Sequence, residues 1–231
     1  MTCKFFLYSF LIAVLAGPLQ ADPGNKIGMV WSGPVTGKKI AITFDDGPHR
    51  LNTPKVLEIL EQTDARATFF VLGKRVKESG EQGEMILRRM IRGGHEIGNH
   101  SYSHPNITKL PRKDLIQQIR MCQDIIESKT GKRPVLFRPP GGNLNVAGIR
   151  SLSGTEIKHI VNWSVDPMDW KGLEKSRLWQ KVAEKVEPGS IILLHDTSDE
   201  TITALSGLID ILQAKGFELV TVSELLQSHS D

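Results

Sequence analysis

Five groups of ionisable side chains each follow the end of a short apolar run. They are Asp45 with Asp46, His100 with His104, Arg138, Asp166 with Asp169, and His195 with Asp196. Carboxylates and imidazoles exchange protons and bind divalent cations, whereas a guanidinium keeps a permanent positive charge. If the apolar runs are parallel strands, the groups meet at the carboxyl end of the sheet, where (β/α) barrels gather their reactive side chains. The pattern therefore predicts one site built from distant parts of the chain.

The first candidate within that site is a metal centre. His100 and His104 lie four residues apart and share a face if the turn between them is helical. A histidine pair alone is more often a surface or capping feature, so a third ligand is needed, and Asp46 is the candidate. Two imidazoles and one carboxylate leave coordination positions open for water and substrate. We therefore predict one divalent transition metal ion at Asp46, His100 and His104.

The carboxylate pair Asp45-Asp46 has more than one interpretation. Asp-Gly-Pro is ordinary turn chemistry, and Gly47 with Pro48 follows here. Adjacent carboxylates repel one another unless a cation lies nearby, which favours a metal at Asp46 and leaves Asp45 to accept a proton. An aspartyl phosphatase would also place an Asp after a strand. Aspartyl phosphatases normally have a second Asp two residues after the first, but the residue two positions after Asp45 is Gly47.

A second group of candidates could supply and hold a proton. His195 titrates near neutral pH and could act as a general acid. Alternatively, it is a buried structural histidine held by Asp196 or by a backbone carbonyl. Asp169 could orient the His195 imidazole, and the charge of Arg138 could fix the position of Asp45.

The elements that must position these residues alternate along the chain. Helical patterns open at Thr53-Pro54 and cover about 82–92, 112–129, 175–186 and 199–214, the last ending before Gly216. Strands that alternate with helices pair in parallel and make an α/β fold, either an incomplete barrel or a doubly wound sheet. The five polar groups favour the barrel. The seven candidate strands are 40–44, 68–71, 96–98, 135–137, 160–164, 190–194 and 217–220.

The N-terminus has the pattern of a secretory signal peptide. Lys4 precedes an apolar run from Phe5 to Ala16, and a small residue, Ala21, follows. The run is too short to span a bilayer as a stable helix, although an uncleaved anchor is the alternative. We predict that residues 1–21 are removed and that the protein is secreted or periplasmic.

The remaining chain is predicted to be one domain. Residues 22–37 form a polar lead-in, and 38–231 form the catalytic domain. The net charge of +3 is spread without a basic stripe, which argues against nucleic acid as a partner. Cys122 is the one cysteine after the signal, so no intramolecular disulfide can form, and its helical spacing predicts burial. We expect a monomer.

The motifs together resemble a known family. TFDDGP at 43–48, HSYSH at 100–104, RPP at 138–140, DPMDW at 166–170 and LLHD at 193–196 are similar to the motif series of the polysaccharide deacetylases. This family is also called the NodB-homology domain or carbohydrate esterase family four. Each motif alone is weak, but the five occur in the family's order and at its approximate spacing. The resemblance covers about residues 40–220.

The resemblance implies a fold and a set of roles. The fold is a distorted, incomplete (β/α) barrel with about seven parallel strands, and the cofactor is one divalent ion, usually zinc. By position, Asp46, His100 and His104 match the metal ligands, Asp45 the general base and His195 the general acid. Arg138 matches the partner of the base, Asp169 the support of the acid, and Trp170 with Leu193 the apolar pocket for the acetyl methyl group.

One motif departs from the family pattern. An aromatic residue usually follows the two prolines, and here Gly141 and Gly142 stand in that place. The resemblance assigns a backbone N–H near Gly141 to the oxyanion, so that donor is kept while the aromatic wall is missing. We expect a wider groove, unless a neighbouring loop supplies another aromatic side chain.

The predicted function is removal of N-acetyl groups from a GlcNAc-containing polysaccharide. Chitin oligomers, peptidoglycan and poly-N-acetylglucosamine all remain open as substrates. One alternative is an esterase that removes O-acetyl groups from xylan or a similar glycan. Another is a non-catalytic glycan-binding member, which the presence of base, acid and three ligands disfavours.

Overall fold

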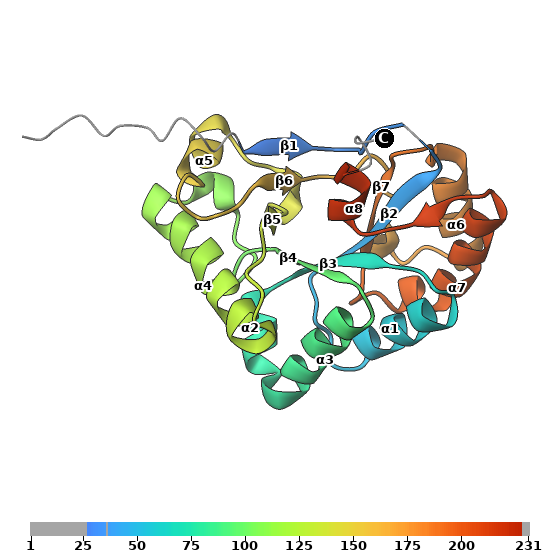
Figure 1. Ribbon diagram of the computed structural model, residues 1–231, viewed down its shortest axis with the longest axis horizontal. Coiled ribbons are helices and arrows are strands. Elements are labelled where there is room, and N and C mark those ends of the chain that lie inside the picture. Colours follow the sequence, from blue (N-terminus) through green and yellow to red (C-terminus); the bar gives the residue numbers. More distant parts are fainter. Residues whose placement is uncertain (1–26, 36, 228–231) are drawn as a thin grey trace, which may run out of the picture.

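The computed structural model describes residues 27–35 and 37–227. Within these residues, a curved sheet of eight parallel strands is surrounded by helices (Figure 1). The strand order is β1-β6-β5-β4-β3-β2-β7, and β8 pairs with β2. The strands are β1 (Gly28–Val30), β2 (Lys39–Asp45), β3 (Ala67–Val71), β4 (Glu96–Asn99), β5 (Leu136–Phe137), β6 (His159–Val161), β7 (Ile191–His195) and β8 (Glu218–Leu219).

The sheet curls until the chain after β6 reaches β7. The Ser164 N–H donates to the Ile191 carbonyl at 3.0 Å, and the Leu193 N–H donates to the Val165 carbonyl at 2.9 Å. Among the described residues, β6 itself does not pair with β7, and an isolated bridge between Val165 and Ile192 joins the two sides, so the barrel is incomplete and distorted. The predicted fold class is confirmed.

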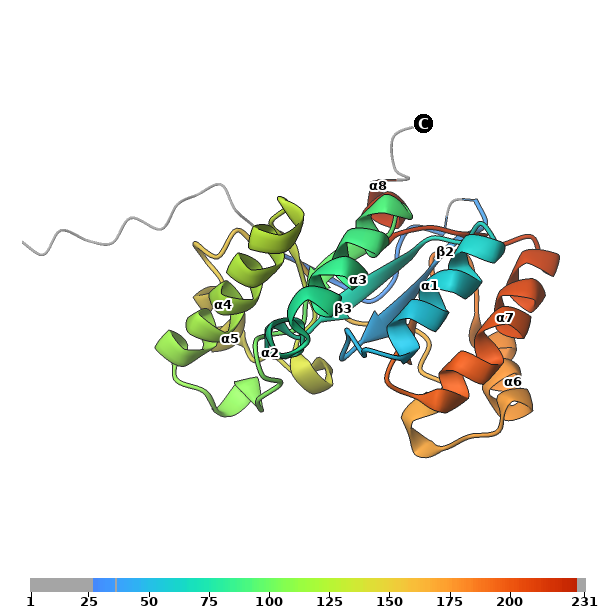
Figure 2. The ribbon, with the colours of Figure 1, turned by 90° about the horizontal axis from the view of Figure 1, so that it is seen from below.

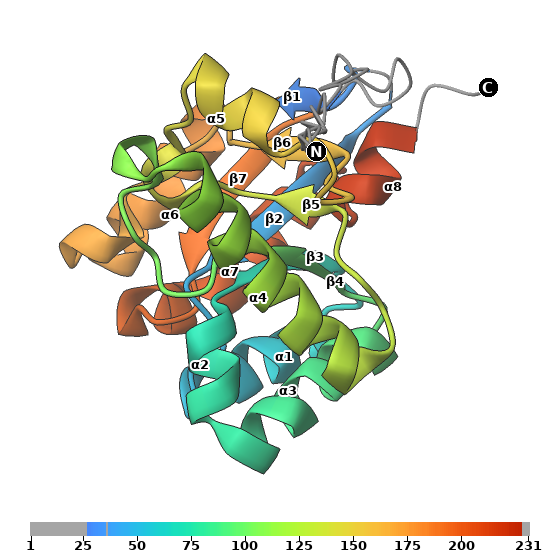
Figure 3. The same cartoon turned by 90° about the vertical axis from the view of Figure 1, so that its left-hand side faces the viewer.

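Helices cover the outer side of the sheet. Figure 2 shows α1, α3 and α7 lying along one side, and Figure 3 shows α4 with α5 along another. The five predicted helices are present, and three short ones were missed because six residues give too little periodicity to read. The helices are α1 (Asn52–Gln62), α2 (Gly73–Glu78), α3 (Gly80–Arg92), α4 (Arg112–Thr130), α5 (Val146–Ser151), α6 (Lys175–Lys185), α7 (Asp199–Ala214) and α8 (Val222–Gln227).

The start of α1 differs from the prediction. The helix begins at Asn52, its N-cap position is Leu51, and no side chain caps it. Thr53 therefore lies inside the helix. Its hydroxyl accepts from the His49 N–H at 2.7 Å and donates to the Asp196 carboxylate. The Thr53 side chain thus links the loop before α1 to the loop after β7 instead of opening the helix.

Alternation along β2 separates an outer core from an inner one. Ile40, Ile42 and Phe44 pack against the helices in a large apolar cluster. Ala41 points the other way, into a smaller cluster closed by residues of α8. Because side chains alternate along a strand, Asp45 shares the inner face with Ala41. The strand periodicity thus directs this carboxylate into the barrel.

The predicted lead-in segment contributes a strand that the sequence did not indicate. Met29 of β1 pairs with Ile160 of β6, at the edge of the sheet. A three-residue strand with only partial burial leaves no alternating apolar run to recognise. The predicted signal peptide, residues 1–21, lies outside the described residues. Among the residues that are described, no helix is long and apolar enough to cross a membrane.

Gly98→Ala tests how tightly the interior is packed beneath the site. A methyl group at Gly98 in β4 would stand 2.5 Å from two ring atoms of Phe70. The Phe70 ring lies beneath the Arg138 guanidinium, 4.1 Å from its central carbon. We expect a loss of about 1–3 kcal/mol in the free energy of unfolding, measured by urea denaturation. An unchanged midpoint and slope would show that the interior absorbs a methyl group.

Candidate active site

The predicted site residues meet at one cavity of about 730 Å³ at the carboxyl ends of the strands. Two of them, Arg138 and Asp169, have no exposed surface and lie beneath it. The structure thus brings together side chains that lie up to 150 residues apart in the sequence, counted from Asp45 to His195. The other predicted residues line the cavity: Asp45, Asp46, His100, His104, Gly141, Trp170, Leu193 and His195.

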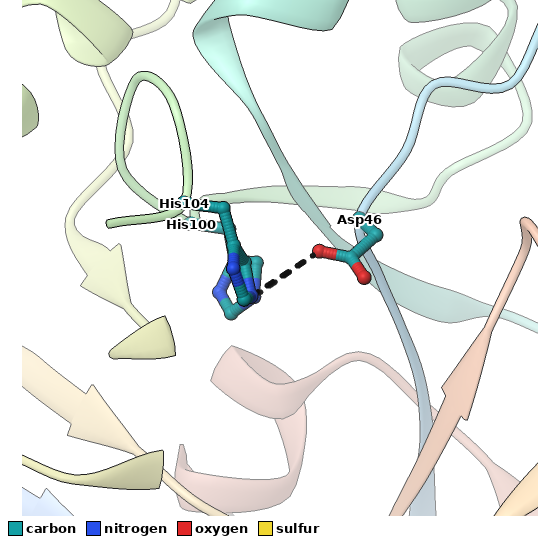
Figure 4. A group of neighbouring side chains, drawn as sticks. All are labelled: Asp46, His100 and His104. Carbon is teal, nitrogen blue, oxygen red and sulfur yellow. Dashed lines mark ion pairs between the residues drawn. The ribbon is translucent and has the colours of Figure 1, made fainter. Parts of the chain in front are cut away.

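Asp46, His100 and His104 form the predicted three-residue group (Figure 4). Asp46 Oδ1 lies 3.6 Å from Nε2 of each histidine, and the three ligand atoms lie within 4.8 Å of one another. The segment between the histidines is not helical, contrary to the condition assumed from their spacing. Positive φ angles at Ser101 (74°) and His104 (59°) fold it back instead and bring the ring centroids to 5.1 Å.

The chemistry of this group fits a divalent cation. Asp46 Oδ1 is buried and accepts no hydrogen bond from the described residues. His100 Nδ1–H donates to the Arg138 carbonyl at 2.8 Å, so Nε2 keeps its lone pair facing Asp46. Burial lowers the pKa of His100, against the opposing charges of Asp45 and Asp46, and favours the neutral ring that binds metal. A cation between Asp46 Oδ1 and the two histidine Nε2 atoms would accept a lone pair from each of them.

Asp45 is held from the other side by Arg138. The guanidinium Nη1 donates to Asp45 Oδ1 at 2.8 Å and to the Thr43 hydroxyl at 2.7 Å. Its remaining donors reach the carbonyls of Val161 at 3.1 Å and Asn162 at 3.0 Å. Because one Asp45 oxygen is committed to Arg138, the other is left toward the metal group, 3.7 Å from His100 Nε2.

His195 and Asp169 form a second fixed pair. His195 Nδ1–H donates to Asp169 Oδ1 at 2.8 Å, and the His195 backbone N–H donates to Asp169 Oδ2 at 2.7 Å. The Thr201 hydroxyl also donates to Asp169. Asp196, the alternative partner, binds Thr53 instead.

The environment of His195 favours its protonated form. Burial acts to lower the pKa of His195, but the hydrogen bond and charge of Asp169 outweigh it. Together with the charges of Asp45 and Asp46, they raise the pKa to about 9. The His195 ring is therefore doubly protonated at neutral pH. Its Nδ1–H is bonded to Asp169, and its Nε2–H is left for other groups.

The two glycines of the third motif differ in their surroundings. Both have positive φ, 68° at Gly141 and 72° at Gly142, where other residues are strained. A methyl group at Gly142 would stand 2.7 Å from Trp163 Cη2, whereas one at Gly141 would meet only Asn143, at 4.0 Å. The indole of Trp163 therefore occupies the space beside Gly142.

Trp163 is a cavity residue that the sequence analysis missed. It lines the cavity together with Gly141 and Trp170, so a neighbouring loop does supply an aromatic side chain near the motif. The predicted strand 160–164 contained Trp163, but β6 ends at Val161, so this residue follows a strand end as other cavity residues do. Trp170 is 60% exposed at the cavity, and Leu193 is buried in its wall.

The chain is similar to known proteins. The family described as polysaccharide deacetylase matches residues 32–159. Peptidoglycan-N-acetylmuramic acid deacetylase PdaC of Bacillus subtilis is 42% identical over 188 residues, 81% of this chain and 38% of PdaC. A peptidoglycan-N-acetylglucosamine deacetylase of Bacillus cereus is 36% identical over 211 residues, 90% of this chain and 75% of that protein. The crystal structure of BA3943, a carbohydrate esterase family four pseudoenzyme of Bacillus anthracis, matches with a TM-score of 0.80 and 30% identity, over 87% of this chain and 70% of that one.

This chain belongs to the polysaccharide deacetylase family. The resemblance read from the five motifs is confirmed, and named deacetylases are similar over most of the chain. The chain spans 38% of the length of PdaC, so it corresponds to a part of that longer protein.

The titration of His195 can be checked directly. In protein stripped of metal, NMR of the ring C–H groups should show a pKa near 9. Because this pKa is raised, the added stability is fully present below the ordinary value of about 6.5 and is lost as the pH rises through 9. Asp169→Asn removes the partner charge and should return the pKa of His195 toward about 6.5. Equal titration in both proteins would contradict the assigned pair.

Proposed function

We propose that this protein is a secreted, metal-dependent deacetylase that removes N-acetyl groups from a GlcNAc-containing glycan, with peptidoglycan as the first candidate. The proposal rests on the arrangement of three groups around one cavity. A carboxylate fixed by Arg138 and an imidazole fixed by Asp169 line the same cavity as the group of Asp46, His100 and His104. Both named relatives act on peptidoglycan, which supports this substrate.

Asp45 is the proposed general base. Arg138 occupies its Oδ1, so Oδ2 is the oxygen free to take a proton from an attacking water. This hydrogen bond and ion pair also restrict rotation of the Asp45 carboxylate. Asp46, His100 and His104 would hold one divalent ion, with zinc as the first candidate. When bound, such an ion supplies Lewis acidity, which lowers the pKa of water and polarises a carbonyl group.

His195 is the proposed general acid. Asp169 holds the Nδ1 side of the ring, so the Nε2 proton is the one available to the leaving nitrogen. An amine leaves only with a proton, whereas an alcohol needs that proton less. The raised pKa of His195, about 9, keeps the acid loaded at neutral pH and favours N-acetyl over O-acetyl substrates.

The acetyl group is placed by the cavity wall. Leu193 and Trp170 offer apolar surface to the methyl group, and Gly141 exposes its backbone beside them. A backbone N–H directed at a developing oxyanion typically contributes about 3 kcal/mol to the transition state. Gly141 is the proposed donor.

Two other functions make different predictions. An O-acetyl esterase would release acetate faster from acetylxylan than from acetylated amino sugars. A non-catalytic member would release none, and the likeness to a pseudoenzyme shows that this fold alone does not decide the matter. An acetate-release screen on chito-oligosaccharides, peptidoglycan, poly-N-acetylglucosamine and acetylxylan, with and without added zinc, distinguishes the three. Release confined to acetylxylan would overturn the proposal.

Metal binding should depend on His100. His100→Ala removes one of three ligands, and we expect loss of bound zinc, measured by plasma mass spectrometry, together with loss of acetate release. His159→Ala is the matched control, because His159 lies in β6 and outside the cavity. Full metal content and full turnover in His100→Ala would disprove the ligand assignment.

Asp45 should be separable from metal binding. Asp45→Asn keeps the size of the side chain but removes the proton acceptor. We expect metal content to stay the same and kcat to fall by about 10²–10⁴-fold. Asp210→Asn, on the exposed side of α7, controls for loss of one negative charge. A near-normal kcat in Asp45→Asn would rule out this base.

A further inference from the structure

One buried aspartate is bonded to His195, a second follows it in the chain, and each accepts a hydrogen bond from a threonine hydroxyl. The Thr201 hydroxyl donates to Asp169, and the Thr53 hydroxyl donates to Asp196. Both aspartates and both threonines are buried, so these bonds are closed off from bulk water. Only Asp169 is bonded to the His195 ring.

The two aspartates differ in how many donors they accept. Asp169 Oδ1 accepts from His195 Nδ1, and Oδ2 accepts from the His195 backbone N–H and from the Thr201 hydroxyl. Asp196 Oδ1 has no partner among the described residues. Burial raises the pKa of Asp196 to about 7, although the hydrogen bond from Thr53 acts against this rise. Asp169 therefore has the donors that a buried negative charge requires, and Asp196 does not.

Thr201 reaches Asp169 from the first turn of α7. The helix begins at Asp199, and Ser198 caps it by accepting from the Thr201 N–H at 3.2 Å. Because the cap fixes the backbone of Thr201, the hydroxyl is held against Asp169, which lies 32 residues earlier in the sequence. Neither Thr201 nor Asp169 lines the catalytic cavity. Their bond therefore lies outside the surface that a glycan would touch.

We propose that Thr201 is a positioning residue of the deacetylation reaction. Its hydroxyl holds the Asp169 carboxylate in the orientation in which both oxygens face His195, and it takes up part of the negative charge on Oδ2. The inference rests on the proposed role of His195 as general acid. Without this donor, Asp169 would turn more freely, and the His195 Nε2–H would be aimed less well at the leaving nitrogen.

Other charged groups surround His195, but none of them duplicates this bond. Asp45 and Asp46, at the end of β2, act on the ring through their charge. No lysine or arginine is among the described residues that line the cavity. A change at Thr201 alters the hydrogen bonding of Asp169 and leaves the surrounding charges in place. The remaining carboxylates near the ring are Asp196, next in the chain, and the cavity residues Asp166, Asp199 and Glu200.

Thr201→Val tests the bond with little change in side-chain shape. Asp169 Oδ2 still accepts from the His195 N–H, so the substitution leaves no carboxylate oxygen without a donor. In the zinc-loaded protein, NMR should give a His195 pKa higher by roughly 0.5 than in the unmodified protein, because fewer donors share the charge of Asp169. Thr201→Ser restores the hydroxyl and should restore the titration. An identical His195 titration in Thr201→Val and in the unmodified protein would overturn the inference.

Kinetics show whether the bond serves the reaction. With acetylated chito-oligosaccharides, Thr201→Val should lower kcat about 5-fold and leave KM unchanged, as expected for a hydrogen bond that matters in the transition state. Thr201→Ser should recover most of the lost kcat. Thr203→Val makes the same exchange at an exposed position of α7 and should change neither value. Equal losses of kcat in Thr201→Val and Thr201→Ser would contradict a role for the hydroxyl.

Two outcomes distinguish this inference from the proposed function. Acetate release that is as fast in Thr201→Val as in the unmodified protein would overturn the inference and leave the deacetylase function standing. If the unmodified protein releases no acetate from any glycan, the proposed function fails, and a His195 titration shifted by Thr201→Val would still support the action of Thr201 on His195.

Discussion

Arg138 holds its guanidinium inside the sheet with no exposed surface. Burying this charge costs several kcal/mol of hydration unless the donors are satisfied, and a single carboxylate does not satisfy five of them. Asp45, the Thr43 hydroxyl and two carbonyls at the end of β6 share that task. The Arg138 side chain can bond to all of these groups only if the carboxyl ends of β2, β5 and β6 lie next to one another at the same edge of the sheet. The position of Asp45, and with it the proposed base, follows from this requirement.

Two ion pairs of different kinds face the same cavity. Arg138 is permanently charged, and its guanidinium holds Asp45 by a hydrogen-bonded ion pair of 2.8 Å. His195 is titratable, and the buried Asp169 makes its protonated form the stable one, with a pKa of about 9. Each pair thus contains an aspartate in a different role. Asp45 is itself the proposed base, whereas Asp169 supports the proposed acid, His195. The partner of each aspartate decides which role is available.

The third motif places two glycines shortly after the buried Arg138 side chain, and their surroundings differ. Trp163 comes from the loop after β6 and packs against Gly142, where any side chain would collide with it. Gly141 has no such neighbour, since only Asn143 Nδ2 lies as near as 4.0 Å to a methyl group built there. Asp45 and the metal group are held by other elements, at the ends of β2 and β4.

The sequence by itself determined the order of seven strands and five helices, the ionisable groups at strand ends and the family. These are local properties: periodicity, residue type and spacing along the chain. Only the tertiary structure decided that Asp45 faces Arg138, since the alternation of β2 turns Asp45 inward while a φ of 70° turns Asp46 toward the histidines. Likewise, only the fold decided that His195 pairs with Asp169 and not with the adjacent Asp196. Asp169 lies 26 residues earlier in the sequence and is brought to His195 by the packing of its loop. Strand β1 escaped prediction because it is defined by pairing with a distant strand, which leaves no period in three residues of sequence. Trp163 escaped because the end of β6 at Val161, three residues before the predicted end, depends on tertiary contacts.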